Sequence, residues 1–128
     1  MSVFRGGCHC GRIEFEVEGD LEQVTICTCS LCSKQGYMHW LVTRAQFKLR
    51  SSPKDLSTYL FTTARARHHF CTTCGTAPLA IPRAHPHSID INVRCLDGVD
   101  FATLAIKYQD RSRWAAAADD DEQRVLDS

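Results

Sequence analysis

The sequence predicts an all-β or β-rich domain with few short helices, and two observations support that fold class. Apolar residues alternate with polar ones along residues 12–19 and again along residues 88–94. A period of two is typical of strands that bury one face and expose the other. Helical spacing of apolar residues is scarce until residues 114–126, which we expect to form a short helix or to be disordered.

The alternation is clearest in the first of these segments, where Ile13, Phe15 and Val17 are separated by glutamates. Between the two segments, the same reasoning gives further strand candidates at residues 37–43, 47–50, 58–62, 66–71 and 79–82. The chain has 128 residues, which suits one domain and leaves no room for a second core.

Charge and hydropathy narrow the expected partners. The 15 basic and 15 acidic side chains cancel, although residues 115–128 hold five acids and one base. Such a balance predicts no nucleic-acid partner. No apolar run approaches the roughly 20 residues that span a bilayer, and the first residues contain no apolar signal core. We therefore expect a cytoplasmic protein with no membrane partner.

The eight cysteines are the most informative feature of the composition. They occupy positions 8, 10, 27, 29, 32, 71, 74 and 95, so seven of them fall into tight clusters. Disulfides suit secreted domains, whereas this density without a secretion signal is more typical of metal binding.

Two of the clusters share one design, in which a cysteine pair is followed by glycine. Cys8 and Cys10 precede Gly11, while Cys71 and Cys74 precede Gly75. Sulfurs on a tetrahedral zinc lie about 3.8 Å apart, whereas residues i and i+2 of a straight strand lie roughly 6.6 Å apart. The glycines allow the bends that this difference requires. The two pairs therefore predict one closed four-thiolate site, with two disulfides or buried thiols as the alternative.

The third cluster offers three ligands instead of four. Cys27, Cys29 and Cys32 can surround one ion, and no fourth cysteine lies beside them. Zinc with three protein ligands and one open position is the catalytic pattern, and that position can accept water or a thiol. Cys95 could complete the set, but a lone cysteine near the end of a strand is more typical of a small buried side chain.

These motifs together resemble a known family. They are GCHCG at residues 7–11, CTCSLC at 27–32, FCTTCG at 70–75 and NVRCLDG at 92–98. In this order, over residues 5–114, they are similar to the glutathione-dependent formaldehyde-activating family, which also includes the domain of centromere protein V. The resemblance implies a Mss4-like fold with zinc-stabilised antiparallel sheets. It also implies a formaldehyde-activating-type zinc domain over residues 1–114, followed by an acidic tail over residues 115–128.

The resemblance further implies two zinc ions and a reaction. A structural zinc would bind Cys8, Cys10, Cys71 and Cys74, and a catalytic zinc would bind Cys27, Cys29 and Cys32. The family's named activity joins glutathione to formaldehyde and gives S-hydroxymethylglutathione, as a carbon–sulfur lyase. We therefore expect a small-molecule thiol and an aldehyde as partners. This chain is shorter than the best-known members, so the resemblance does not identify which thiol and which aldehyde react. The Mss4-like resemblance also allows an alternative, a non-catalytic zinc module for protein interaction.

Several other side chains are candidates for a supporting role. Alternation before Cys71 places His69 on the face of the thiolates and His68 towards the core. His39 and Trp40 could line a pocket at the open zinc, although packing in the core is the more ordinary role of strand residues. Arg94 could bind a substrate carboxylate or lie at the surface. We expect His85 and His87 to be surface residues.

Overall fold

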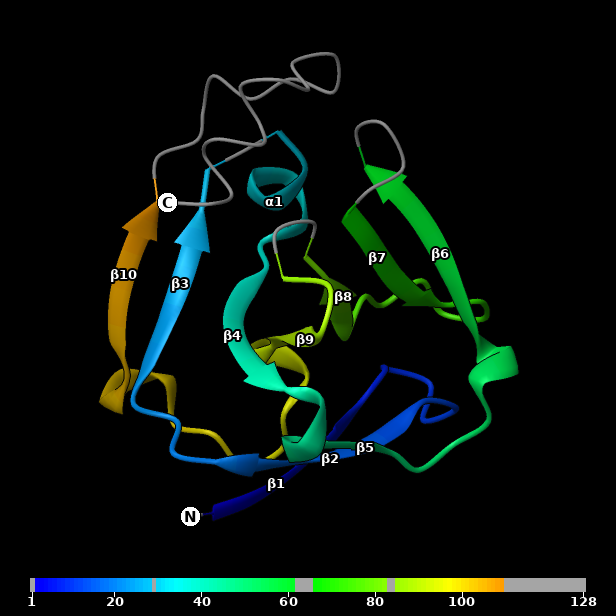
Figure 1. Ribbon diagram of the computed structural model, residues 1–128, viewed down its shortest axis with the longest axis horizontal. Coiled ribbons are helices and arrows are strands. Elements are labelled where there is room, and N and C mark those ends of the chain that lie inside the picture. Colours follow the sequence, from blue (N-terminus) through cyan, green and yellow to red (C-terminus); the bar gives the residue numbers. More distant parts are fainter. Residues whose placement is uncertain (1, 29, 62–65, 83–84, 110–128) are drawn as a thin grey trace.

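The computed structural model describes residues 2–28, 30–61, 66–82 and 85–109, which form two β-sheets and a short helix (Figure 1). The helix α1 spans Ser30–Gln35. The strands are β1 Ser2–Gly7, β2 Glu14–Gly19, β3 Gln23–Cys27, β4 Met38–Thr43, β5 Phe47–Leu49, β6 Leu56–Phe61, β7 Ala66–Cys71, β8 Leu79–Ile81, β9 Ser88–Asn92 and β10 Ala105–Gln109. Short 3-10 turns lie at Arg44–Gln46, Pro53–Asp55, Val93–Cys95 and Phe101–Thr103.

The two sheets differ in size. The smaller has the strand order β1-β2-β5, and the larger has the order β10-β3-β4-β9-β8-β7-β6. The predicted β-rich fold with few short helices is thus confirmed. Pairing is antiparallel in these ladders, as expected, except between β10 and β3, which run parallel.

The expected strands are present with small differences at their ends. The segment 66–71 is β7 with the bounds that the sequence predicts. The strand expected over 12–19 begins only at Glu14, because residues 8–13 form a tight turn. The strand expected over 88–94 ends at Asn92, whose side chain accepts a hydrogen bond from the Arg94 N–H and starts a 3-10 turn.

Three strands and the helix were not expected from the sequence. In β1 the residues have no clear alternation, and β10 is largely exposed. The third, β3, is short and ends at Cys27, the first cysteine of the three-cysteine segment, and α1 begins three residues later at Ser30. The tail at residues 115–128, and the helix considered for 114–126, lie outside the described residues.

The core lies between the two sheets. Phe15 and Val17 of β2 pack against Val24 of β3, Met38 of β4 and Ile91 of β9. These side chains are almost fully buried, which follows from the period-two pattern of their strands. In Figure 1 the smaller sheet crosses one end of β3 and β4. The core therefore fills the space between the smaller sheet and that end of the larger sheet.

The described part of the chain contains no helix that is both long enough and apolar enough to cross a membrane.

The core predicts a clear contrast between two aliphatic residues of adjacent strands. Ile91 is fully buried, while Leu41 keeps 47% of its surface exposed. Ile91→Ala is expected to lower the free energy of unfolding by about 2–5 kcal/mol, because it removes buried surface and leaves a cavity. Leu41→Ala is the matched control and should change it by less than about 0.5 kcal/mol. Urea denaturation of both variants measures this, and equal losses would contradict the packing.

Candidate metal centre

The first cysteine pair lies in the turn that connects β1 with β2. The Cys8 N–H donates to the Ile13 carbonyl at 3.1 Å, and the Gly11 N–H donates back to the Cys8 carbonyl at 3.3 Å. Gly11 has a φ of +86°, a conformation that other residues rarely adopt. The bend brings the sulfurs of Cys8 and Cys10 to 3.6 Å, as the sequence predicts for this pair.

The second pair lies in the turn that follows β7 and has nearly the same hydrogen bonds. The Cys71 N–H donates to the Thr76 carbonyl at 2.9 Å, and the Gly75 N–H donates to the Cys71 carbonyl at 2.9 Å. Gly75 has a φ of +79°. In both turns the first cysteine bonds the carbonyl five residues ahead, and the glycine bonds back to that cysteine. Two separate segments thus have one local design.

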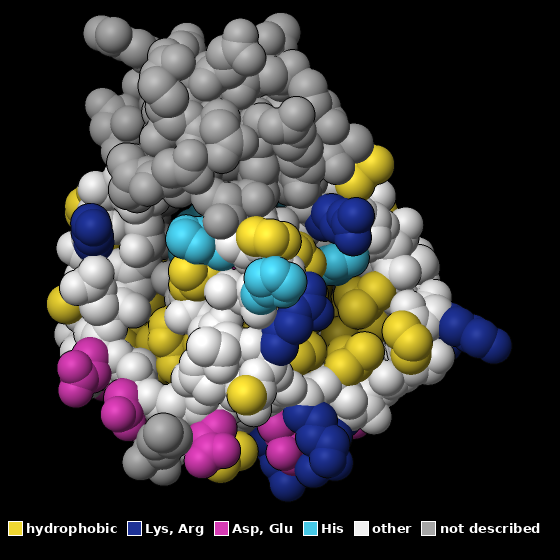
Figure 2. Space-filling model, in the orientation of Figure 1, with side chains coloured by type: hydrophobic (Ala, Val, Ile, Leu, Met, Phe, Trp, Pro, Cys, Tyr) yellow, Lys and Arg dark blue, Asp and Glu magenta, His cyan; other side chains and the backbone are white. Residues whose placement is uncertain are grey.

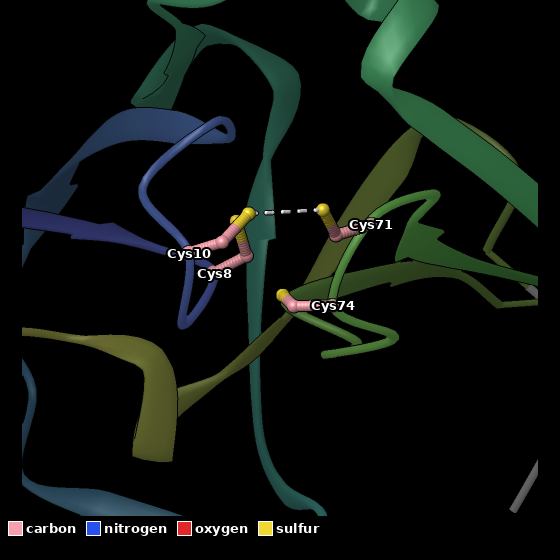
Figure 3. A group of neighbouring side chains, drawn as sticks. All are labelled: Cys8, Cys10, Cys71 and Cys74. Atoms are coloured by element: carbon pink, nitrogen blue, oxygen red, sulfur yellow. Dashed lines mark hydrogen bonds between the residues drawn. The ribbon is translucent and has the colours of Figure 1, made fainter.

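The two turns face each other and bring all four sulfurs together (Figure 3). The sulfurs of Cys10 and Cys71 are 3.6 Å apart, and all four lie within 4.8 Å of one another. A tetrahedral thiolate site needs separations of about 3.8 Å, so the donor set fits a metal ion. Backbone N–H groups already point at the sulfurs, from Ile13 to Cys8 at 3.2 Å and from Thr73 to Cys71 at 3.4 Å.

Electrostatics also favour a cation at this site. The Thr76 hydroxyl and N–H, with the Cys10 backbone, lower the pKa of Cys74 to about 5. The Arg12 N–H lowers the pKa of Cys10, but burial and the neighbouring thiols outweigh it and raise this pKa to about 11. Four touching thiols cannot all ionise unless a positive charge compensates them. A divalent ion supplies that charge, and zinc and iron are the metals that suit four tetrahedral sulfurs.

The three-cysteine segment is only partly described. Cys27 ends β3 and Cys32 lies in α1, and both are buried. Cys29 lies outside the described residues. Among the residues that the structure describes, the four-cysteine cluster is the group in which three or more potential metal ligands lie close together. The site predicted for Cys27, Cys29 and Cys32 therefore remains a prediction.

Cys95 lies near the four-cysteine cluster. Its thiol is half-buried and points towards the Ala77 carbonyl, with 3.9 Å between sulfur and oxygen. Burial raises the pKa of Cys95 to about 11, and nearby Cys8 and Cys74 add to this effect. These neighbours give no support to the alternative in which Cys95 completes the three-cysteine site.

The two histidines of β7 differ in their surroundings. His68 is buried, as the alternation predicts. The ring of His69 shares a hydrogen bond of 2.9 Å with the Thr58 hydroxyl. Burial, assisted by Arg67, lowers the pKa of His69 and so favours its neutral form. A neutral His69 adds no positive charge beside the thiolates.

The remaining candidates divide between surface and core. Histidine side chains are visible on the face shown in Figure 2, and His85 and His87 are exposed, as expected. Arg94 is also exposed, with its guanidinium 5.6 Å from the centre of the Phe101 ring. Trp40 packs against the core cluster, as strand packing predicts.

His39 has a polar partner instead of a place in the core. Its Nδ1 lies 2.5 Å from Oδ2 of Asp90, a residue that sequence reasoning missed. Asp90 stands at a polar position in the alternating segment 88–94, but only the pairing of β4 with β9 brings it beside His39. The alternation alone therefore carried no signal for this pair.

Comparison with known proteins places this geometry in context. The model of a family described as glutathione-dependent formaldehyde-activating enzyme matches residues 3–111, which contain both cysteine pairs and the three-cysteine segment. The crystal structure of a Rhodobacter sphaeroides protein is 30% identical to this chain. The match covers 80% of this chain and 99% of that chain, with a TM-score of 0.71.

The four-cysteine cluster predicts that loss of one ligand unfolds the protein. A structural zinc contributes on the order of 10 kcal/mol in small domains, which equals the whole stability of many domains. Cys71→Ser is therefore expected to lose this metal and the cooperative melting transition. Cys95→Ser, which changes a neighbouring thiol outside the cluster, should keep both. Circular dichroism melts with metal analysis decide the matter, and a normal melt for Cys71→Ser would contradict the assignment.

Proposed function

The chain belongs to the glutathione-dependent formaldehyde-activating family, and from this premise we propose that it is a zinc-dependent carbon–sulfur lyase. It joins a thiol, with glutathione the first candidate, to formaldehyde or a related aldehyde, or catalyses the reverse reaction. With glutathione and formaldehyde the product is S-hydroxymethylglutathione. The observation that supports this most is the division of the cysteines. Four sulfurs form a complete group, and Cys27 and Cys32 do not belong to it.

We propose two zinc ions with different duties. Cys8, Cys10, Cys71 and Cys74 hold a structural zinc, because their four sulfurs leave no position open. Cys27, Cys29 and Cys32 would hold a second zinc, and a metal bound there would favour the nucleophilic thiolate form of a thiol at neutral pH.

The residues around the three-cysteine segment would orient the reactants and exclude water from them. Cys27 and Cys32 keep only 6% and 7% of their surface exposed. Such burial excludes water and strengthens electrostatic interactions at the reacting atoms. The end of β3 and the short α1 hold these two cysteines on one local segment. A thiol and an aldehyde held in the right orientation on this segment would react as if within one molecule, without first having to collide in solution.

The reaction is an addition in which atoms and electrons balance. The S–H bond breaks, sulfur forms a bond with the aldehyde carbon, and the C=O π pair moves to oxygen. The proton ends on that oxygen as a hydroxyl. We place the reaction in the cytoplasm, where free thiols stay reduced.

The alternative function is a non-catalytic zinc module for protein interaction. In that case a fourth ligand from the protein would close the three-cysteine site, and no small thiol would bind there. The two functions therefore differ in whether the second zinc accepts an external ligand.

Metal content is the first prediction of this proposal. Protein purified under reducing conditions is expected to contain two zinc ions per chain, and Cys29→Ser should contain one. Because the second site lies on a short local segment, Cys29→Ser should keep its fold and melt cooperatively. Inductively coupled plasma measurements with circular dichroism test both statements. One or no zinc in the wild type would refute the two-site proposal.

Thiol binding is the second prediction. In cobalt-substituted protein, glutathione is expected to intensify the sulfur-to-metal absorption, because one more soft ligand enters the open position. Cys29→Ser, which keeps the closed site, should show no such change. NMR exchange spectroscopy on glutathione mixed with formaldehyde should then show faster exchange of the adduct with the wild type. An unchanged cobalt spectrum, with the second metal present, would favour the interaction module.

A further inference from the structure

The face of the larger sheet that points away from the core carries several polar side chains. In β4, Met38 and Val42 belong to the core cluster, so alternation turns His39 to the opposite face. His39 pairs with Thr25 of β3, and Cys27 follows Thr25 by two residues. Cys27 is therefore on the same face and is a diagonal neighbour of His39 across the two strands.

On this face His39 is fixed from two sides. Its Nδ1 lies 2.5 Å from Asp90 Oδ2, and the two side chains keep 14% and 13% of their surface exposed. The ring of Tyr37 lies against the imidazole with 4.5 Å between the centroids. The Tyr37 hydroxyl donates to the Asp90 backbone carbonyl at 3.0 Å. Tyr37 and Asp90 thus hold each other as well as His39.

Asp90 determines which nitrogen of His39 carries the proton. A carboxylate can only accept, so the Nδ1–H of His39 donates to Asp90 Oδ2, and in this tautomer Nε2 is the acceptor nitrogen. Nε2 is buried and has no hydrogen-bond partner among the described residues. A buried polar atom without a partner costs free energy, and it calls for a functional explanation.

Tyr37 connects this pair with α1. Its pKa lies well above the ordinary value because of burial, then the charge of Asp90, and then the thiols of Cys95 and Cys32. Tyr37 is therefore a neutral phenol within electrostatic range of Cys32. The imidazole of His39 thus lies on the same face as Cys27 and beside the Tyr37 ring, whose pKa is raised in part by Cys32.

Two roles would suit such a nitrogen, and the geometry separates them. A carboxylate-bound histidine is a common zinc ligand. However, His39 forms no group with Cys27 and Cys32 whose ligand atoms all lie within 4.8 Å of one another, in the part of the chain that the structure describes. A proton acceptor needs no such convergence, because it can reach its substrate directly or through one water.

We propose that His39, oriented by Asp90, accepts the proton of the incoming thiol and returns it to the oxygen of the adduct. This step rests on the proposed function. The S–H bond breaks as Nε2 takes the proton, the sulfur pair bonds the aldehyde carbon, and the π pair moves to oxygen. That oxygen then takes the proton from Nε2. Asp90 is a positioning residue that stabilises the imidazolium between the two transfers.

Proton release upon glutathione binding tests this role without turnover. Isothermal titration calorimetry in two buffers of different ionisation enthalpy gives the number of protons released. The wild type is expected to release nearly none, because His39 retains the thiol proton, whereas His39→Gln should release about one per thiol bound. The exposed His85→Gln is the matched control and should behave as the wild type. Adduct exchange should slow about 100-fold in His39→Gln, with unchanged zinc content.

The outcomes separate this inference from the function on which it rests. Equal proton release by the wild type and His39→Gln would overturn the role of His39 while glutathione binding survives. Loss of the second zinc in His39→Gln would overturn it in favour of a metal ligand. No glutathione binding by the wild type would refute the proposed function and the inference with it. If His39→Gln does not fold, Asp90→Asn replaces it, and this near-isosteric variant should release more protons than the wild type.

Discussion

Two cysteine turns, one from each sheet, meet at the four-cysteine cluster and tie the two sheets together. Cys8 follows β1 of the smaller sheet, and Cys71 ends β7 of the larger one. Cys10 and Cys71 are 61 residues apart in sequence, yet their sulfurs are 3.6 Å apart. A bound metal would close this long loop and oppose the chain entropy of the unfolded state. A chain of 128 residues with a modest core gains much from such a link.

Contacts around the cluster show how this link determines the neighbouring segments. Gly6 of β1 forms an isolated bridge with Leu96, and the Asp97 N–H donates to the Arg5 carbonyl at 2.8 Å. The turn that carries Cys95 is thereby attached to the strand that leads into Cys8. Because β9 directly precedes this turn, the link also fixes the strand that carries Asp90. The four-cysteine site takes no part in the proposed reaction, but it helps to position the strand that carries Asp90.

The sequence predicted local features well and long-range pairings poorly. The glycines after each cysteine pair, the alternation of residues 12–19 and the strand at 66–71 depend on neighbouring residues, so they could be predicted. The strand β10 gains its place from parallel pairing with β3, more than 70 residues away in sequence, and its own residues are mostly exposed. The pairing of His39 with Asp90 likewise depends on the register of β4 against β9. No local pattern encodes such a register.

A crystal structure of the protein grown with glutathione, with anomalous data at the zinc edge, would show both metal sites and their ligands at once. We expect two anomalous peaks per chain. One should lie among the sulfurs of Cys8, Cys10, Cys71 and Cys74. The other should lie among those of Cys27, Cys29 and Cys32, with the glutathione sulfur as its fourth ligand. A single peak per chain would contradict the proposal of two zinc sites. A second peak whose fourth ligand is a protein atom would contradict the proposed open position.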